Sequence, residues 1–212
     1  MLQTAERPIV LPAQSYYSTV GKRALDIVGA GIVLVLTLPI VLVVAASLRL
    51  LLGPGILLRQ ERVGKHGEVF RCLKFRTMDN CRRQNDGDPP IEERRITHKA
   101  LHDPRHTTVG RVIRKLSLDE LPQLFNVLVG EMSLVGPRPE MAGLHDSWFY
   151  YHPRHMVRPG ITGPFQVSPL REDGDLLNGL HLDEQYVEEL SASGDLRLLV
   201  STIGVVLRPT GS

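Results

Sequence analysis

The stretch that decides the fold is Arg114–Glu140, with the sequence RKLSLDELPQLFNVLVGEMSLVGPRPE. Ser117, followed three residues later by Glu120, has the form of a capping box and predicts that a helix begins here. Apolar residues then recur at the spacing of one helical face, at Leu121, Leu124, Phe125 and Leu128. Gly130 is a suitable C-terminal stop for this helix.

Pro122 leaves two starting points for this helix open. With Ser117 as the cap, Pro122 lies just past the first turn and removes one hydrogen-bond donor. With Asp119 as the cap, Pro122 lies within the first turn, where it costs little. In both registers Asp119 and Glu120 lie at the positive end of the helix, where N–H groups also suit a phosphate. A purely structural role as helix caps is the first alternative, because capping is a common use of such residues.

Cations surround this carboxylate pair in the sequence. Arg114 lies just upstream, and Arg138 lies downstream between two prolines that fix the local backbone. Arginine presents a planar fork of donors that matches phosphate oxygens. The pattern favours chemistry on a phosphoryl group with a divalent metal beside the two carboxylates.

Composition narrows the class of protein. A chain of 212 residues has room for one domain with a real core. The net charge of +2 and the aromatic content of 5% give no support for a nucleic-acid partner. Cys72 and Cys81 do not form a disulfide framework, so two reduced thiols are expected.

A membrane segment is predicted over residues 27–48, which carry no charge and are long enough to cross a bilayer. Pro39, near the middle, favours a re-entrant helix that is broken and returns to the same side, although prolines also occur in spanning helices. Basic residues flank both ends and favour the cytoplasmic side for each: Lys22, Arg23, Arg49, Arg59, Arg62 and Lys65. Asp26 can pair with Arg23 and Lys22, either at the membrane interface or as a weak surface ion pair.

The rest of the chain predicts an α+β fold that is mainly helical. Short strands are expected at residues 56–58 and 69–75, joined by a basic loop at 60–67. Helices are expected at residues 182–190 and 196–207. The expected units are an N-terminal arm (1–21), the membrane helix (22–52) and a catalytic domain with interfacial helices (53–212).

Three further features suggest no site by themselves. The charged segment 79–95 is expected to be a surface insertion. His98, His102 and His106 recur every four residues, but Pro104 interrupts the helix that a metal site there would need. The aromatic cluster 148–151 suits a core or a membrane interface better than base stacking.

Four motifs, in the same order, resemble those of the bacterial sugar transferases, also called monotopic phosphoglycosyl transferases. They lie at residues 74–78 (KFRTM), 117–123 (SLDELPQ), 136–139 (GPRP) and 158–163 (RPGITG), and the resemblance covers residues 22–208. The chain departs from the family pattern at Leu38, where a serine usually precedes the proline, and at 164–170, where polar and basic residues are missing.

The resemblance implies an enzyme that transfers sugar-1-phosphate from a UDP-sugar to polyprenol phosphate and releases UMP. Asp119 would be the nucleophile that forms a covalent phosphosugar, and Glu120 would hold Mg²⁺ with it. The implied substrate-binding residues are Lys74, Arg76, Arg114, Arg138 and Arg158. The family works at the cytoplasmic face of the bacterial inner membrane, in the first membrane step of exopolysaccharide or lipopolysaccharide assembly.

Two rival functions remain open at the level of sequence. A metal-dependent phosphodiesterase could use the same carboxylates to activate water, and a membrane-anchored binding module could use them only as helix caps. The identity of the sugar and of the polyprenol, and the presence of a homo-oligomer, are also left open.

Overall fold

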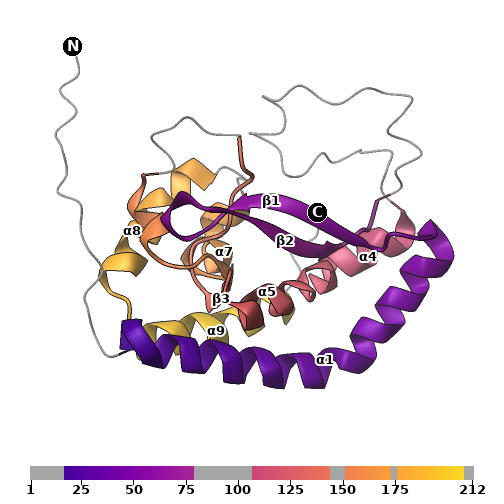
Figure 1. Ribbon diagram of the computed structural model, residues 1–212, viewed down its shortest axis with the longest axis horizontal. Helices are drawn as coiled ribbons and strands as arrows, with labels where there is room; N and C mark the ends of the chain where they lie inside the picture. The colour runs from indigo at the N-terminus through magenta and orange to yellow at the C-terminus, as the bar shows by residue number, and fades with distance from the viewer. Residues whose placement is uncertain (1–16, 79–106, 144–150, 173–175, 208–212) are drawn as a thin grey trace, which may run out of the picture.

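The computed structural model describes residues 17–78, 107–143, 151–172 and 176–207 (Figure 1). Most of the N-terminal arm, the charged insertion with its three histidines, and the aromatic cluster except Tyr151 lie outside the described residues. The described part is mostly helical with short strands, which confirms the α+β prediction.

The longest element is α1 (Lys22–Leu52), which follows the short π-helix η1 (Tyr17–Gly21). It is long and apolar enough to cross a membrane, by length and composition. The helix is continuous through Pro39, and its ribbon changes direction about midway (Figure 1). The side chains that α1 buries lie toward both of its ends: Lys22, Asp26, Ala30, Val44 and Leu48. The prediction of a proline-broken re-entrant helix stays a prediction.

A hairpin follows, formed by β1 (Leu57–Val63), the turn η2 (Lys65–Gly67) and β2 (Val69–Phe75). The two strands pair antiparallel over their whole length. The predicted strand 69–75 is confirmed, but the predicted loop began too early. Its first four residues belong to β1, because they pair with residues 69–72 of the partner strand.

The segment after the insertion forms α4 (Thr108–Lys115), the short 3-10 turn η3 (Leu118–Glu120) and α5 (Gln123–Val129). Gly130 ends α5 in the left-handed conformation, with φ 98°, as predicted. The predicted apolar face is only partly right, because Phe125 is 49% exposed whereas Leu124 and Val127 are buried. In Figure 1, α5 lies between the hairpin and α1.

Two very short parallel strands, β3 (Ser133–Val135) and β4 (Gly160–Thr162), bring the GPRP and RPGITG motifs together. The two motifs touch backbone to backbone: a Cβ atom added to Gly160 would lie 2.1 Å from the nitrogen of Gly136. A side chain therefore does not fit at this crossing.

The chain ends with α7 (Pro164–Val167), α8 (Leu180–Glu188) and α9 (Ala192–Leu207), with the 3-10 turns η4 (Pro153–Met156), η5 (Pro169–Glu172) and η6 (Leu176–Gly179) around them. The two predicted C-terminal helices are confirmed, with earlier starts. The main core cluster joins the hairpin, α5, β3 and α8 through Phe70, Cys72, Leu124, Val127, Met132, Leu134, Val135, Tyr186, Val187 and Leu190.

Candidate active site

The two predicted catalytic carboxylates lie on η3, one turn before α5, and the predicted capping box is wrong. Ser117 has a left-handed backbone (φ 55°, ψ 21°) and makes no capping hydrogen bond through its side chain. An N-cap residue normally needs an extended backbone, so this conformation rules out the reciprocal bond to Glu120. Left-handed non-glycine residues are uncommon and cluster at functional sites. Asp119 and Glu120 are thus presented on a tight turn.

Glu120 is held by two cations from separate elements. The Nζ atom of Lys74, near the end of β2, lies 2.9 Å from the Oε1 atom of Glu120. The Nη2 atom of Arg138 lies 3.7 Å from the same oxygen. The Glu120 and Lys74 side chains are 19% and 15% exposed, so the pair is shielded from bulk water, which strengthens the attraction.

Asp119 differs from its neighbour. It is half-buried and forms no ion pair with any residue that the structure describes. Burial, and then the negative charge of Glu120, raise the pKa of Asp119 to about 6, while Lys74 and Arg114 oppose this shift. Burial would also raise the pKa of Glu120, but Lys74 and Arg138 lower it below its usual range. Adjacent carboxylates therefore have opposite shifts, as is typical of residues with distinct chemical roles.

A small cavity opens beside Glu120. Its wall is formed by Arg62, Cys72, Lys74, Glu120, Gln123, Arg138, Pro139, Gly160 and Ile161. The cavity therefore joins residues of the KFRTM, SLDELPQ, GPRP and RPGITG motifs. Sequence reasoning missed Arg62 and Gln123, which are 6% and 3% exposed. The only available signal was that Gln123 belongs to the SLDELPQ motif.

Asn126 joins α5 to β2, the strand that carries Lys74. Its Nδ2 atom donates to the carbonyl of Arg71, at 2.8 Å, and its Oδ1 atom accepts from the backbone N–H of Leu73, at 3.0 Å. The amide thus pairs with the edge of β2 as a neighbouring strand would. This bond also explains why the buried face of α5 includes residue 126.

The structure does not bring all the predicted cations to the carboxylates. The Nη2 atom of Arg76 donates to the carbonyls of Leu52 and Pro54, at 2.6 and 3.0 Å, where α1 ends. The Nε atom of Arg158 donates to the carbonyl of Gly130, at 2.7 Å, where α5 ends. Both groups thus stabilise the negative ends of helices. Their predicted role in substrate binding stays a prediction.

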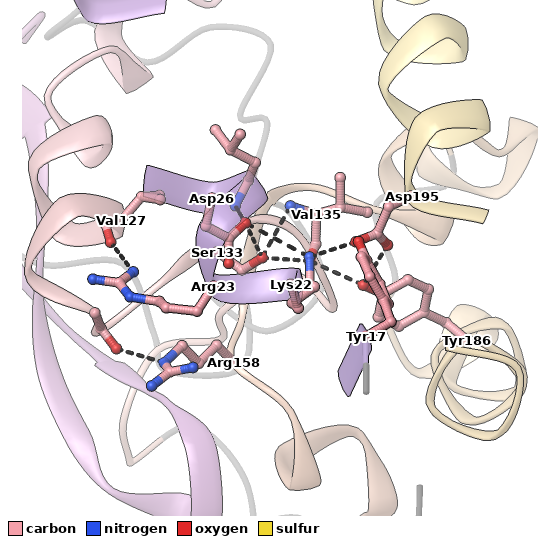
Figure 2. A network of polar contacts seen from close by, with 12 residues as sticks. Tyr17, Lys22, Arg23, Asp26, Val127, Ser133, Val135, Arg158, Tyr186 and Asp195 are labelled. Atoms are coloured by element: carbon pink, nitrogen blue, oxygen red, sulfur yellow. Dashed lines mark hydrogen bonds and ion pairs between the residues drawn. The ribbon is translucent and has the colours of Figure 1, made fainter. Parts of the chain in front are cut away.

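A second polar cluster lies away from this site, where α1 begins (Figure 2). The Nζ atom of Lys22 lies 2.7 Å from the Oδ2 atom of Asp195 and donates to the carbonyl of Val135, at 2.8 Å. Both tyrosines of the cluster, Tyr17 and Tyr186, donate to Asp195. Lys22 and Asp195 are therefore internal partners that join α1 to β3, α8 and α9.

Asp26 completes this second cluster. It is fully buried, 3.7 Å from Lys22, and its Oδ1 atom accepts from the hydroxyl of Ser133 and the N–H of Leu134, at 2.8 and 2.9 Å. The predicted pairing with Lys22 is present, deep inside the protein, whereas Arg23 donates to the carbonyls of Val127 and Leu128. No local pattern in the sequence indicates the two distant partners of Asp26.

The comparisons with known proteins agree with this geometry. Residues 17–209 match the family model described as bacterial sugar transferase. The exopolysaccharide production protein ExoY of Rhizobium meliloti is 37% identical over 99% of this chain and 97% of its own length. A UDP-glucose:undecaprenyl-phosphate glucose-1-phosphate transferase of Caulobacter vibrioides is 40% identical over 88% of this chain and 69% of its own length.

A third relative is a longer protein. The undecaprenyl-phosphate galactose phosphotransferase of Salmonella typhimurium is 41% identical over 90% of this chain, which matches 41% of that protein's length. The match of the family model over nearly the whole described chain, and the meeting of four motifs at one cavity, lead to a single identification. The protein is an enzyme of the bacterial sugar transferase family.

Proposed function

We propose that the protein transfers sugar-1-phosphate from a UDP-sugar to polyprenol phosphate and releases UMP. The observation that carries this proposal is the difference between the two carboxylates. Glu120 is neutralised by Lys74 and Arg138, whereas Asp119 forms no ion pair among the described residues and is influenced by the charges of Lys74 and Arg114. The names of the relatives from Salmonella and Caulobacter support the substrate class.

The first step forms a covalent intermediate on Asp119. A carboxylate oxygen of Asp119 attacks the phosphorus that carries the sugar, and the bond from that phosphorus to the bridging oxygen breaks. UMP leaves with that oxygen, and the sugar phosphate remains as an acyl phosphate. Lys74 and Arg138 neutralise the phosphate oxygens as charge moves to the leaving group.

The second step regenerates the enzyme. An oxygen of polyprenol phosphate attacks the same phosphorus, and the bond between phosphorus and the Asp119 oxygen breaks. The products are a polyprenol diphosphate sugar and free Asp119. Atoms balance without any further reactant, and water must be excluded because it would release the phosphosugar.

The donor set is compatible with Mg²⁺. Both cations approach the Oε1 atom of Glu120, and no bond to its Oε2 atom is made by any described residue, so Oε2 and the Asp119 carboxylate would hold the ion. No cluster of three or more acidic, histidine or cysteine ligands occurs in the described part of the chain, so diphosphate oxygens and water would complete the coordination. When bound, Mg²⁺ offsets the repulsion between a carboxylate and a diphosphate.

The packing of α1 supports a re-entrant helix with both ends on the cytoplasmic side of the inner membrane. Ala30 packs in the main core cluster, whereas Val44 and Leu48 pack with Phe75 and Ile113 of the same domain. A straight helix of 31 residues would be roughly 46 Å long, more than the hydrocarbon core of a bilayer. A helix that crossed this core could not bring both ends to one folded domain.

The exposed surface of α1 supports the same membrane placement. Its exposed side chains include Val28, Val35, Leu36, Leu42, Val43 and Leu50. If this exposed apolar surface of α1 lies in the membrane, the catalytic residues lie near the level of the lipid phosphates.

The decisive experiment omits the lipid. Protein in detergent is mixed with Mg²⁺ and each of a panel of UDP-sugars, and UMP, UDP and intact mass are measured. We expect one UDP-sugar to give a burst of about one equivalent of UMP, with a phosphosugar adduct that maps to Asp119. Release of UDP, or steady release of UMP without an adduct, would contradict the mechanism.

The rivals give different results in the same experiment. A phosphodiesterase releases UMP continuously in water, and a binding module releases nothing. Adding polyprenol phosphate should convert the burst into turnover only if the adduct is an intermediate. Survival of the burst after complete chelation would remove Mg²⁺ from the proposal.

A further inference from the structure

We infer that Arg154 is a positioning residue for Arg138, and that it acts by holding the main chain of the GPRP loop from a buried ion pair. The inference rests on the proposed function, because the role of Arg138 is taken from it. Arg154 touches neither carboxylate of the site, yet it is 1% exposed and is the largest fully buried side chain in the described part of the protein.

The contact between the two arginines is direct. The Nη2 atom of Arg154, on η4, donates to the main-chain carbonyl of Arg138, at 2.6 Å. The same nitrogen lies 3.0 Å from the Oδ2 atom of Asp183, on α8, and the side chains of this ion pair are both 0% exposed. Asp183 therefore neutralises the buried guanidinium that holds the loop.

The carbonyls on either side of Arg138 are held as well. The N–H of Gly160 donates to the carbonyl of Pro137, at 2.9 Å. The Nη1 atom of Arg62 donates to the carbonyl of Pro139, at 3.0 Å. Three successive carbonyls thus accept from donors on β4, η4 and β1, which fixes the loop against three elements.

The position of this loop matters because the Arg138 side chain is long and partly exposed. Its side chain is 31% exposed, and it lies 3.7 Å from Glu120, so its direction depends on where its Cα atom is held. The prolines on both sides restrict the backbone but do not attach it to the domain. A shift of about 1 Å in a group that orients a reacting phosphate can cost on the order of 100-fold in rate.

A paired substitution can separate a role of Arg154 in positioning Arg138 from a role in the stability of the fold. A buried ion pair does not by itself indicate a gain in stability, since a well-packed apolar pair can replace it. The paired change Arg154→Met with Asp183→Leu removes the donor to the Arg138 carbonyl without leaving a lone buried charge. It should therefore fold, while it frees the loop.

The test is a double-mutant cycle measured by single-turnover release of UMP and by the KM for UDP-sugar. In the wild-type background, the paired change should lower the rate and raise KM by about 10-fold or more. In an Arg138→Ala background, where no side chain remains to be positioned, the same change should alter both values less than about twofold.

Equal effects in the two backgrounds would overturn the inference, because a loss of general stability acts regardless of Arg138. Asp195→Asn, in the distant second cluster, is the matched control and should have the same effect in both backgrounds. If the paired variant does not fold, Arg154→Lys replaces it in the same cycle, with the same two outcomes. If the wild type releases no UMP from any UDP-sugar, the proposed function fails, whereas an active wild type with additive effects removes only this inference.

Discussion

Two polar clusters of similar composition differ in how completely the protein satisfies them. The cluster at the start of α1 contains Lys22, Asp26 and Asp195, and its lysine has two carboxylates and a backbone carbonyl as partners. The cluster on η3 contains Lys74, Glu120 and Asp119, and Asp119 forms no ion pair with a described residue. Both clusters join elements far apart in the sequence.

The difference separates a structural role of buried charges, at the start of α1, from a role in binding, on η3. Asp26 and Asp195 are fully buried and receive hydrogen bonds from hydroxyl and N–H groups, and only the Oδ2 atom of Asp26 has no such bond from a described residue. Buried networks of this kind fix one arrangement of the chain. In the second cluster, Lys74 and Arg138 line a cavity beside Glu120, and Asp119 forms no ion pair with a described residue, which suits an anionic substrate. Four variants test this contrast.

The largest expected effect is that of Asp119→Asn. The amide has the same shape but cannot form the acyl phosphate, so single-turnover UMP release should fall by at least about 10³-fold. Because Asp119 has no ion-pair partner among the described residues, the melting temperature should change little. A variant that still formed the adduct would place the nucleophile elsewhere.

Asp195→Asn should have the opposite profile. It leaves Lys22 buried without its closest carboxylate, which costs about 3 kcal/mol in the free energy of unfolding. Thermal unfolding in detergent measures the loss, and Glu188→Gln, an exposed change on α8, is the control. Activity per folded molecule should stay close to the wild-type value. Full stability in this variant would contradict the structural role of the cluster.

Lys74→Met should shift the pH dependence of adduct formation. In the wild type, the rate should fall below about pH 6, because the pKa of Asp119 is raised to about 6 and the protonated acid is not a nucleophile. Lys74 lowers the pKa of both carboxylates, so its removal should move this acid limb to higher pH. Rates at fixed Mg²⁺ concentration give the profile. Arg71→Met, exposed on the same strand, should leave the limb in place.

The smallest effect is expected for Arg76→Ala. Its guanidinium donates to two carbonyls at the end of α1, so the free energy of unfolding should fall by about 1 kcal/mol. The KM for UDP-sugar should change less than about twofold, as in the exposed control Arg59→Ala. A tenfold rise in KM for Arg76→Ala alone would show that it binds phosphate, as the family resemblance implies.

The sequence predicted what depends on local pattern. Strand 69–75 and the stop at Gly130 follow from alternation and from glycine, and the structure confirms both. The capping box failed because Ser117, between α4 and η3, has a left-handed conformation that its local sequence does not require. The meeting of Lys74, Glu120 and Arg138 could be predicted because all three belong to the motifs of one family.

The sequence could not predict contacts between residues that are far apart along the chain. The family motifs mark a cation at Arg158, but they do not say whether its guanidinium meets a carbonyl or a phosphate. Likewise, the pairing of Asp26 with Lys22 follows from their spacing in the sequence. Its bonds to Ser133 and Leu134, more than 100 residues away, do not. Asn126, which ties α5 to the edge of β2, carries no local signal at all.

The bond between Tyr17 and Asp195 spans 178 residues, and this span has a consequence for synthesis. At about 5–20 residues per second, α1 leaves the ribosome roughly 10–35 s before α9 can supply its carboxylate. During that interval the ammonium of Lys22 lacks its closest partner, the carboxylate of Asp195. Ribosome-bound chains that end before Asp195 should therefore expose Lys22 to amine-reactive reagents, and longer chains should protect it.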